Sequence, residues 1–311
     1  MNDKIILEVK NLTKQFGNFV AVNNISFSIK EGEIVGFLGQ NGAGKTTTIQ
    51  MLMGSLTPTS GTISYFGKDL KKHRSEIVES VNFSSTYTNL PWDLTVKENL
   101  TFISYLYEIK KRKERVETVI EMFKLEDLKN KQIRALSAGQ ITRVNLAKAF
   151  INFPKVLLLD EPTASLDPDI AKYVRDFLLE QRRKHELSII ITSHNMAEVE
   201  EVCDRVIFIN KGEIVSDDTP ERLAKSIKLT HINLIIQEHM QKAIAYCEKE
   251  KIQHEVDEKH LSIEISEKRI PKLLSDLSDL GILYSEITIE KPTLEDYFFQ
   301  MVSERKIHES S

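Results

Sequence analysis

A glycine-rich loop near the N-terminus carries the most distinctive chemistry in the sequence. The segment Gly39–Thr46 follows the pattern Gly-x-x-x-x-Gly-Lys-Thr, and Thr47 comes directly after it. Its glycines let backbone N–H groups curl around phosphate oxygens, where a side chain would clash. Lys45 adds a positive charge for the β- and γ-phosphates, and the Thr46 hydroxyl is placed to ligate Mg²⁺. The loop predicts binding of ATP with Mg²⁺, through Gly39, Asn41, Gly42, Gly44, Lys45, Thr46 and Thr47.

Two adjacent acids form a second candidate site. The run Val156–Glu161 is an apolar strand that ends in Asp160 and Glu161. Ligands of open α/β sheets gather at the carboxyl ends of the strands. We expect Asp160 to hold Mg²⁺ and Glu161 to polarise an attacking water as general base. Beside the phosphate loop, this pair predicts ATP hydrolysis.

These residues need a sheet whose strand ends converge, and residues 1–228 have the pattern of one α/β domain. Strand-like runs alternate with helical ones, which predicts a largely parallel sheet covered by helices. The expected strands are Ile5–Val9, Val20–Val22, Ile25–Ile29, Glu33–Leu38, Thr62–Phe66, Val81–Phe83, Val156–Asp160, Ser188–Thr192, Arg205–Asn210 and Glu213–Val215. The expected helical stretches are Thr46–Leu52, Val96–Leu128, Ser137–Phe150, Pro168–Lys184 and Met196–Val202.

A change of pattern predicts a second domain at 229–302. Strands and helices follow there in the order β-α-β-β-α-β, and Leu261–Ile265 alternates apolar and polar residues with a period of two. This order is typical of a small ferredoxin-like α+β domain. A closing helix is expected at Thr293–Met301 and a flexible tail at 303–311.

Composition narrows the class of protein. The chain has 311 residues and a formal net charge of -4, without a basic stripe, so we expect no nucleic-acid partner. Its two cysteines, Cys203 and Cys247, match no metal-binding spacing and indicate reduced thiols. The longest apolar runs have the length of strands, whereas a membrane-spanning helix needs about 20 apolar residues. No targeting segment is visible, so we expect a cytoplasmic protein.

Further motifs give the sequence a family resemblance. Leu136-Ser137-Ala138-Gly139-Gln140 precedes the acidic pair, Ala164–Asp167 follows it, and Thr192-Ser193-His194 comes later. With the phosphate loop, these motifs resemble the ATP-binding cassette (ABC) ATPases over residues 5 to about 228. The resemblance implies a P-loop NTPase fold of the ABC type. Its parts would be a mixed sheet core, an antiparallel β subdomain and a helical signature subdomain at about 87–153.

The resemblance also implies roles for single residues. Ser137, Gly139 and Gln140 would meet the γ-phosphate of an ATP held by a second copy, so that two chains enclose two ATP molecules. Catalysis would rest on Glu161, His194 and Lys45, with His194 contacting the γ-phosphate. Asp167 would couple the two sites, Phe16 would stack on adenine unless it serves in core packing, and Val22 would line the same nucleotide site.

Two positions depart from the family pattern. Ala138 replaces a glycine of the signature, which is a mild change if its φ is negative, as at a helix start. The family commonly places a glutamine after the strand that ends near residue 85, and the sequence has Ser85 and Thr86 there. Either hydroxyl could act through an additional water, or the coupling between the sites differs.

The C-terminal sequence separates the functional subgroups. Lys291–Phe298 is similar to the ending of ATPases that serve type-2 ABC exporters. This implies an integral membrane permease as partner and a peripheral position on the inner face of the cell membrane. Pro91 and Trp92 could contact that permease or belong to the core. The second domain could stabilise or regulate the dimer, sense a ligand or be a structural appendage. The alternatives are a soluble ABC ATPase without a transport role and an inactive cassette, which the intact Lys45 and acidic pair disfavour.

Overall fold

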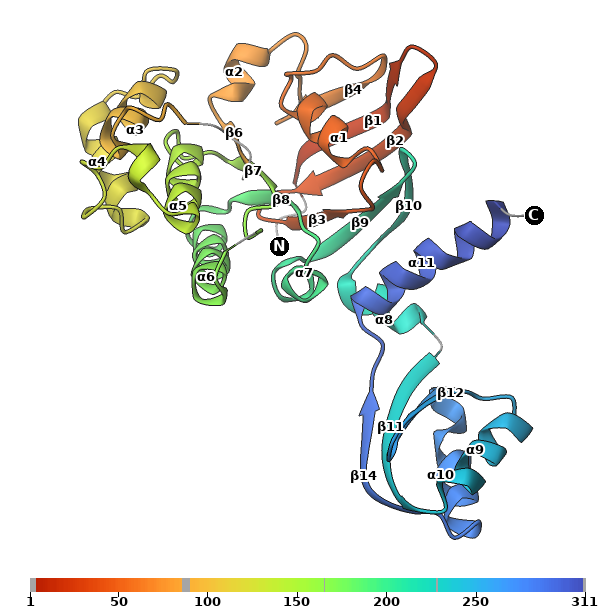
Figure 1. Ribbon diagram of the computed structural model, residues 1–311. Helices are drawn as coiled ribbons and strands as arrows, with labels where there is room; N and C mark the ends of the chain where they lie inside the picture. Colours follow the sequence, from red (N-terminus) through yellow and green to blue (C-terminus); the bar gives the residue numbers. More distant parts are fainter. Residues whose placement is uncertain (1–3, 86–89, 165, 228, 310–311) are drawn as a thin grey trace. The chain divides into compact units, whose positions relative to one another are not determined.

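The computed structural model describes residues 4–85, 90–164, 166–227 and 229–309. The chain forms two compact units, Met1–Thr219 and Pro220–Ser311. Figure 1 shows the elements of both units in sequence colours. The sequence predicts a boundary near residue 228, later than the division after Thr219. The difference is helix α8 (Pro220–Ser226), which contacts α11 (Leu294–Glu309) in the second unit.

A six-stranded sheet forms the centre of the first unit. Its strands lie in the order β10-β9-β3-β8-β7-β6, and all neighbours are parallel except β10 and β9. The bounds are β3 (Ile34–Leu38), β6 (Val81–Ser85), β7 (Val156–Asp160), β8 (Ser188–Thr192), β9 (Arg205–Asn210) and β10 (Glu213–Asp218). Apolar residues on both faces of β3, β7 and β8 are buried, as expected for a covered parallel sheet. Parallel pairing brings the carboxyl ends of five strands to one edge.

A second, antiparallel sheet packs into the same core. It contains β1 (Ile5–Phe16), β2 (Phe19–Lys30), β4 (Ser60–Tyr65) and β5 (Lys68–Asp69), in the order β2-β1-β4-β5. The two strands expected at Val20–Val22 and Ile25–Ile29 are one strand, β2. Asn24 keeps the strand continuous by adopting a φ of 51° at a register shift against β1. Asparagine tolerates this conformation, so the polar interruption is an irregularity in a strand.

The helices of the first unit cover the central sheet and form a helical group. Their bounds are α1 (Lys45–Leu52), α2 (Arg74–Val78), α3 (Val96–Ser104), α4 (Arg112–Met122), α5 (Ala138–Ala149), α6 (Pro168–His185) and α7 (Met196–Val202). The stretch expected to be helical from Val96 to Leu128 is broken between α3 and α4. Thr95 begins α3 with a capping box to Glu98. Helices α3, α4 and α5 contact one another and lie together in Figure 1.

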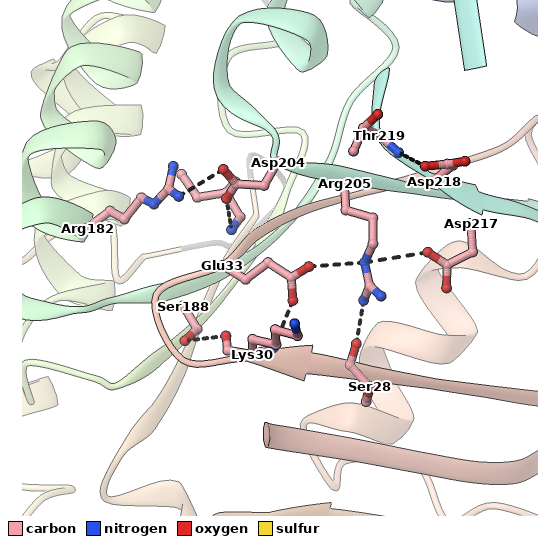
Figure 2. Close-up of polar contacts among 11 residues, drawn as sticks. Ser28, Lys30, Glu33, Arg182, Ser188, Asp204, Arg205, Asp217, Asp218 and Thr219 are labelled. Atoms are coloured by element: carbon pink, nitrogen blue, oxygen red, sulfur yellow. Dashed lines mark hydrogen bonds and ion pairs between the residues drawn. The ribbon is translucent and has the colours of Figure 1, made fainter. Parts of the chain in front are cut away.

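A polar network fixes the amino ends of the central strands, opposite the converging carboxyl ends. The Arg205 guanidinium lies 3.1 Å from Glu33 and 3.4 Å from Asp217 (Figure 2). Arg182 donates to Asp204 at 2.8 Å, and Asp204 accepts a 2.9 Å bond from the first backbone N–H of β3. Burial raises the pKa of Asp217, and the Arg205 charge opposes that rise. These charged groups pair with one another and hold the starts of the strands in place. The residues expected to bind ATP lie at the opposite edge of the sheet.

The second unit has its own sheet and core. The order of its elements is β11 (Leu229–Glu238), α9 (Met240–Lys249), β12 (Gln253–Asp257), β13 (His260–Ser266), α10 (Ile270–Asp279) and β14 (Leu283–Glu290). The strands lie in the order β12-β13-β11-β14 and are antiparallel, which is the ferredoxin-like arrangement expected from the sequence. Helix α11 continues to Glu309, through most of the segment expected as a flexible tail.

Within the described ranges, no helix combines the length and the apolar character that crossing a membrane requires.

Candidate functional site

The phosphate loop joins β3 to α1, as the sequence predicts. Two of its glycines, Gly39 and Gly44, lie against backbone of other elements. A Cβ on Gly39 would lie 2.2 Å from the Ile209 carbonyl oxygen, and one on Gly44 would lie 2.5 Å from that of Ala21. Gly44 has a φ of 106°, which side-chain-bearing residues rarely adopt. The loop is therefore held close to β2 and β9, and its small residues suit the approach of a phosphate group.

Lys45 is buried within the loop that precedes it. Its ammonium donates to the carbonyl oxygens of Gly39 at 2.5 Å and Gln40 at 3.1 Å. Burial lowers the pKa of Lys45, whereas the charges of Glu161 and Asp160 act to raise it. The structure thus brings the lysine of the loop into electrostatic contact with both acids at the end of β7.

The two acids lie at the edge where β7 and β8 end. The Thr192 hydroxyl donates to Asp160 Oδ1 at 2.6 Å, and the Glu161 backbone N–H donates to the Thr192 hydroxyl at 3.1 Å. His194 Nε2 lies 2.9 Å from Glu161 Oε1. Burial raises the pKa of Glu161, opposed by the charges of His194 and Lys45. A carboxylate with a raised pKa beside an imidazole is suited to accept a proton from water.

Three elements carry oxygen atoms that could hold Mg²⁺. Thr46 is exposed in the first turn of α1, and Asp160 lies half-buried at the end of β7. Ser85 ends β6 directly beside Asp160 in the strand register and is buried. Hydroxyl and carboxylate oxygens are the ligands that Mg²⁺ prefers, so these residues fit the ion. Thr86, the other candidate for the missing glutamine, lies outside the described residues.

The signature residues begin another helix. Ser137 is the N-cap of α5: its hydroxyl accepts from the Gln140 N–H, and the Gln140 side chain accepts from the Ser137 N–H. Ala138 has no positive φ, so it fits the helix start without strain. Ser137 is exposed, and no hydrogen bond in the described part of the chain connects it, Gly139 or Gln140 to the phosphate loop. Within one chain the signature and the loop therefore remain separate.

The comparisons with known proteins agree with this arrangement. The family model described as ABC transporter matches residues 22–164. The bacitracin transport ATP-binding protein BcrA of Bacillus licheniformis is 31% identical over 308 residues, covering 96% of this chain and 97% of that protein. The chain therefore belongs to the ATP-binding proteins of ABC transporters. The Nod factor export ATP-binding protein I of Burkholderia orbicola is 37% identical over 222 residues, covering 71% of this chain and 73% of that protein.

Solved structures of ABC cassettes share the fold of this chain over most of its length. The structure of cbiO1 from Clostridium perfringens has a TM-score of 0.64 and 30% identity, covering 71% of this chain and 90% of that one. The P-loop ABC fold expected from the sequence is confirmed. Membership of this family makes the chain an ATPase that binds nucleotide.

The two residues expected near adenine, Phe16 and Val22, lie on β1 and β2. Phe16 is 49% exposed at the end of β1, with the Lys14 ammonium 4.9 Å from its ring. Exposure argues against core packing as its only role. Val22 is fully buried and lies 3.4 Å from where a Cβ of Gly44 would stand. Val22 thus supports the loop from behind, and the expected contact with nucleotide stays a prediction.

Two groups near the site were not singled out from the sequence. The Thr192 hydroxyl contacts both acidic residues, whereas the motif Thr192-Ser193-His194 predicts a role for His194 alone. The second group is Glu198 on α7, which accepts a 2.5 Å bond from the Thr163 hydroxyl and a 2.8 Å bond from Arg175 on α6. The only sequence signal for either group is a polar residue inside a buried strand or on the apolar face of a helix.

Proposed function

We propose that this ABC ATPase energises a separate membrane permease, as part of an exporter. ATP binding would close a dimer of two copies, and hydrolysis would reopen it. The observation that carries the hydrolytic step is the 2.9 Å contact of His194 with Glu161, beside Asp160 and within electrostatic reach of Lys45. An acid, an imidazole and an ammonium at one sheet edge are the groups that phosphoryl transfer to water requires.

Each residue of the site has a role in this proposal. Lys45 and the loop N–H groups bind the β- and γ-phosphates, and Glu161 accepts the proton of the attacking water. His194 holds the Glu161 carboxylate and the γ-phosphate in line. Thr46 and Asp160 would hold Mg²⁺, which neutralises phosphate charge during transfer. Positioning and charge stabilisation supply most of the rate in such reactions.

A second copy completes the site. Ser137 and Gly139 lie at an exposed helix start, where backbone N–H groups and the helix dipole favour an anion. Asp167 is exposed at the start of α6. Since Ser137 makes no bond to its own chain's loop, we assign these residues to the γ-phosphate site of the partner in a head-to-tail homodimer.

An exposed apolar surface supports a permease partner. Trp92, Phe102, Tyr105 and Leu106 are each more than half exposed, on or beside α3. Large aromatic and aliphatic side chains that remain exposed together mark interaction sites. Trp92 is thus available for contact with the permease. This partner would hold the ATPase at the inner face of the cell membrane.

Export is the direction that the relatives favour. The printed names of two relatives refer to bacitracin transport and to Nod factor export. The first of them aligns along 96% of this chain, including the C-terminal unit, which a soluble ABC ATPase without a transport role does not explain. The comparisons therefore favour a transport ATPase over a soluble ABC ATPase without a transport role.

The variant Glu161→Gln tests the proposal. We expect kcat for ATP to fall by about 10²–10⁴-fold, because the general base is lost. Light scattering after gel filtration with ATP and Mg²⁺ should show a stable dimer. The control is Glu186→Gln, which changes an exposed glutamate that has a similar φ of 51° at the end of α6. Normal turnover by a monomeric Glu161→Gln protein would contradict both the assigned base and the dimer.

A further inference from the structure

We propose that Thr192 is a positioning residue for ATP hydrolysis, whose single hydroxyl sets Asp160 and Glu161 together. The inference rests on the roles proposed above for those two acids. Thr192 ends β8 and has no exposed surface, so it does not touch the nucleotide. In the parallel pairing of β7 with β8, Thr192 lies directly opposite Asp160.

The geometry uses both capacities of the hydroxyl. Its proton is donated to Asp160 Oδ1, at a short distance of 2.6 Å. Its oxygen accepts the backbone N–H of Glu161 at 3.1 Å. A hydroxyl has one proton, so donation to Asp160 leaves the lone pairs for the Glu161 N–H. One buried group thereby bonds to two adjacent residues of the site.

The bond to Asp160 restrains the carboxylate that would hold Mg²⁺. With Oδ1 held by Thr192, the carboxylate cannot rotate freely, so it would present a fixed orientation to Mg²⁺. Hydrogen bonds of this kind orient metal ligands, and removing them typically weakens metal binding or activity. Valine at position 192 would leave Oδ1 without this donor and free the carboxylate to turn.

The bond to Glu161 holds an unusual backbone conformation. Glu161 has a φ of 54°, in the left-handed region that residues with side chains seldom occupy. Its N–H also donates to the Thr192 carbonyl oxygen at 3.1 Å, so the bond is shared between two oxygens of one residue. This turn directs the Glu161 side chain to His194, at 2.9 Å. Strain that the surroundings hold in place is common at functional sites.

The test compares the unchanged full-length protein with Thr192→Val, Thr192→Ala and Thr192→Ser. Thr192→Val keeps the shape of the side chain and removes its hydroxyl. The alanine and serine variants both have a smaller side chain and differ from each other only in the hydroxyl. For Thr192→Val and Thr192→Ala we expect kcat to fall and the half-saturating Mg²⁺ concentration to rise, each by about 10–100-fold. Thr192→Ser should restore most of both. Binding of a fluorescent ATP analogue in EDTA should stay within about twofold of the unchanged protein, because Thr192 does not touch the nucleotide.

The control is Thr230→Val, which removes the hydroxyl of a buried threonine in the second unit. The unfolding temperatures of all variants are measured as well, to distinguish a specific fall in kcat from a general loss of the fold. Unchanged kcat and Mg²⁺ dependence in both the valine and the alanine variants would overturn the proposal. So would a serine variant that behaves like the alanine variant. Failure of the proposed function is a separate result, seen as normal turnover in Glu161→Gln.

Discussion

Backbone contacts decide which glycines of the phosphate loop can be replaced. Gly42 and Gly44 both have a positive φ, so any other residue at either position is strained. They differ in their surroundings. A Cβ on Gly42 would meet no atom within 4 Å, whereas one on Gly44 would lie 2.5 Å from the Ala21 carbonyl oxygen. Replacement of Gly44 therefore displaces the loop from β2 in addition to straining it.

Gly44→Ala is expected to weaken ATP binding by about tenfold or more. A displacement that costs about 1.4 kcal/mol of binding free energy is sufficient for that. Gly67→Ala is the control for backbone strain alone, because Gly67 has a φ of 76°, no atom within 4 Å of the added Cβ, and no place in the site. Titration with a fluorescent ATP analogue gives both affinities. Equal affinities in the two variants would show that the contact with Ala21 does not shape the loop.

At the scale of elements, the sequence predicts the strands and helices that carry the site but not their buried partners. The phosphate loop, the strand ending at Asp160 and the helix beginning after Ser137 follow from local patterns. The continuity of β2 does not, because it depends on Asn24 accepting a left-handed conformation against β1. The role of Thr192 depends on parallel pairing of β7 with β8, which no local pattern specifies.

Helix α7 is tied to its neighbours by one buried acid. Glu198 accepts from Thr163, in the loop after β7, and from Arg175 on α6. The Glu198 side chain is only 10% exposed and that of Arg175 17%. Arg175 makes a second ion pair, at 2.9 Å, with Glu201, whose side chain is 51% exposed. Since α7 begins two residues after His194, Glu198 connects the histidine segment to the loop that follows the acidic pair.

Glu198→Ala should destabilise the first unit by about 2–3 kcal/mol, because it removes charged hydrogen bonds to the half-buried Arg175 and to Thr163. Glu201→Ala removes an exposed partner of the same arginine and should cost about 0–1 kcal/mol. Urea unfolding followed by fluorescence gives the two midpoints, with the change in slope as a check on two-state behaviour. Similar midpoints for the two variants would contradict the assignment of Glu198 as the buried connection.

At the scale of the whole chain, the two units have separate hydrophobic cores. One core joins the antiparallel and central sheets of the first unit. The other lies between the sheet of the second unit and its helices α9 and α10. The sequence predicts the second core from the alternation in Leu261–Ile265, but not the pairing of α8 with α11. Because α8 contacts α11, the chain divides after Thr219. The sequence does not predict this division, because α8 has only seven residues and little local signal.

Separate cores predict separate unfolding transitions in calorimetry. ATP with Mg²⁺ should raise the midpoint temperature of the first unit's transition only, because ligand binding stabilises the unit that binds it.

Leu277→Ala removes a fully buried side chain from the second core and should lower the free energy of unfolding of that unit by about 2–5 kcal/mol. In a domain of about 60–100 residues that lowers the midpoint by about 10 °C or more. Leu280→Ala, at a position 41% exposed in the same region, should change it little. A single transition that both the ligand and Leu277→Ala shift would mean that the units unfold together, and the C-terminal unit would then contribute directly to the stability of the ATPase.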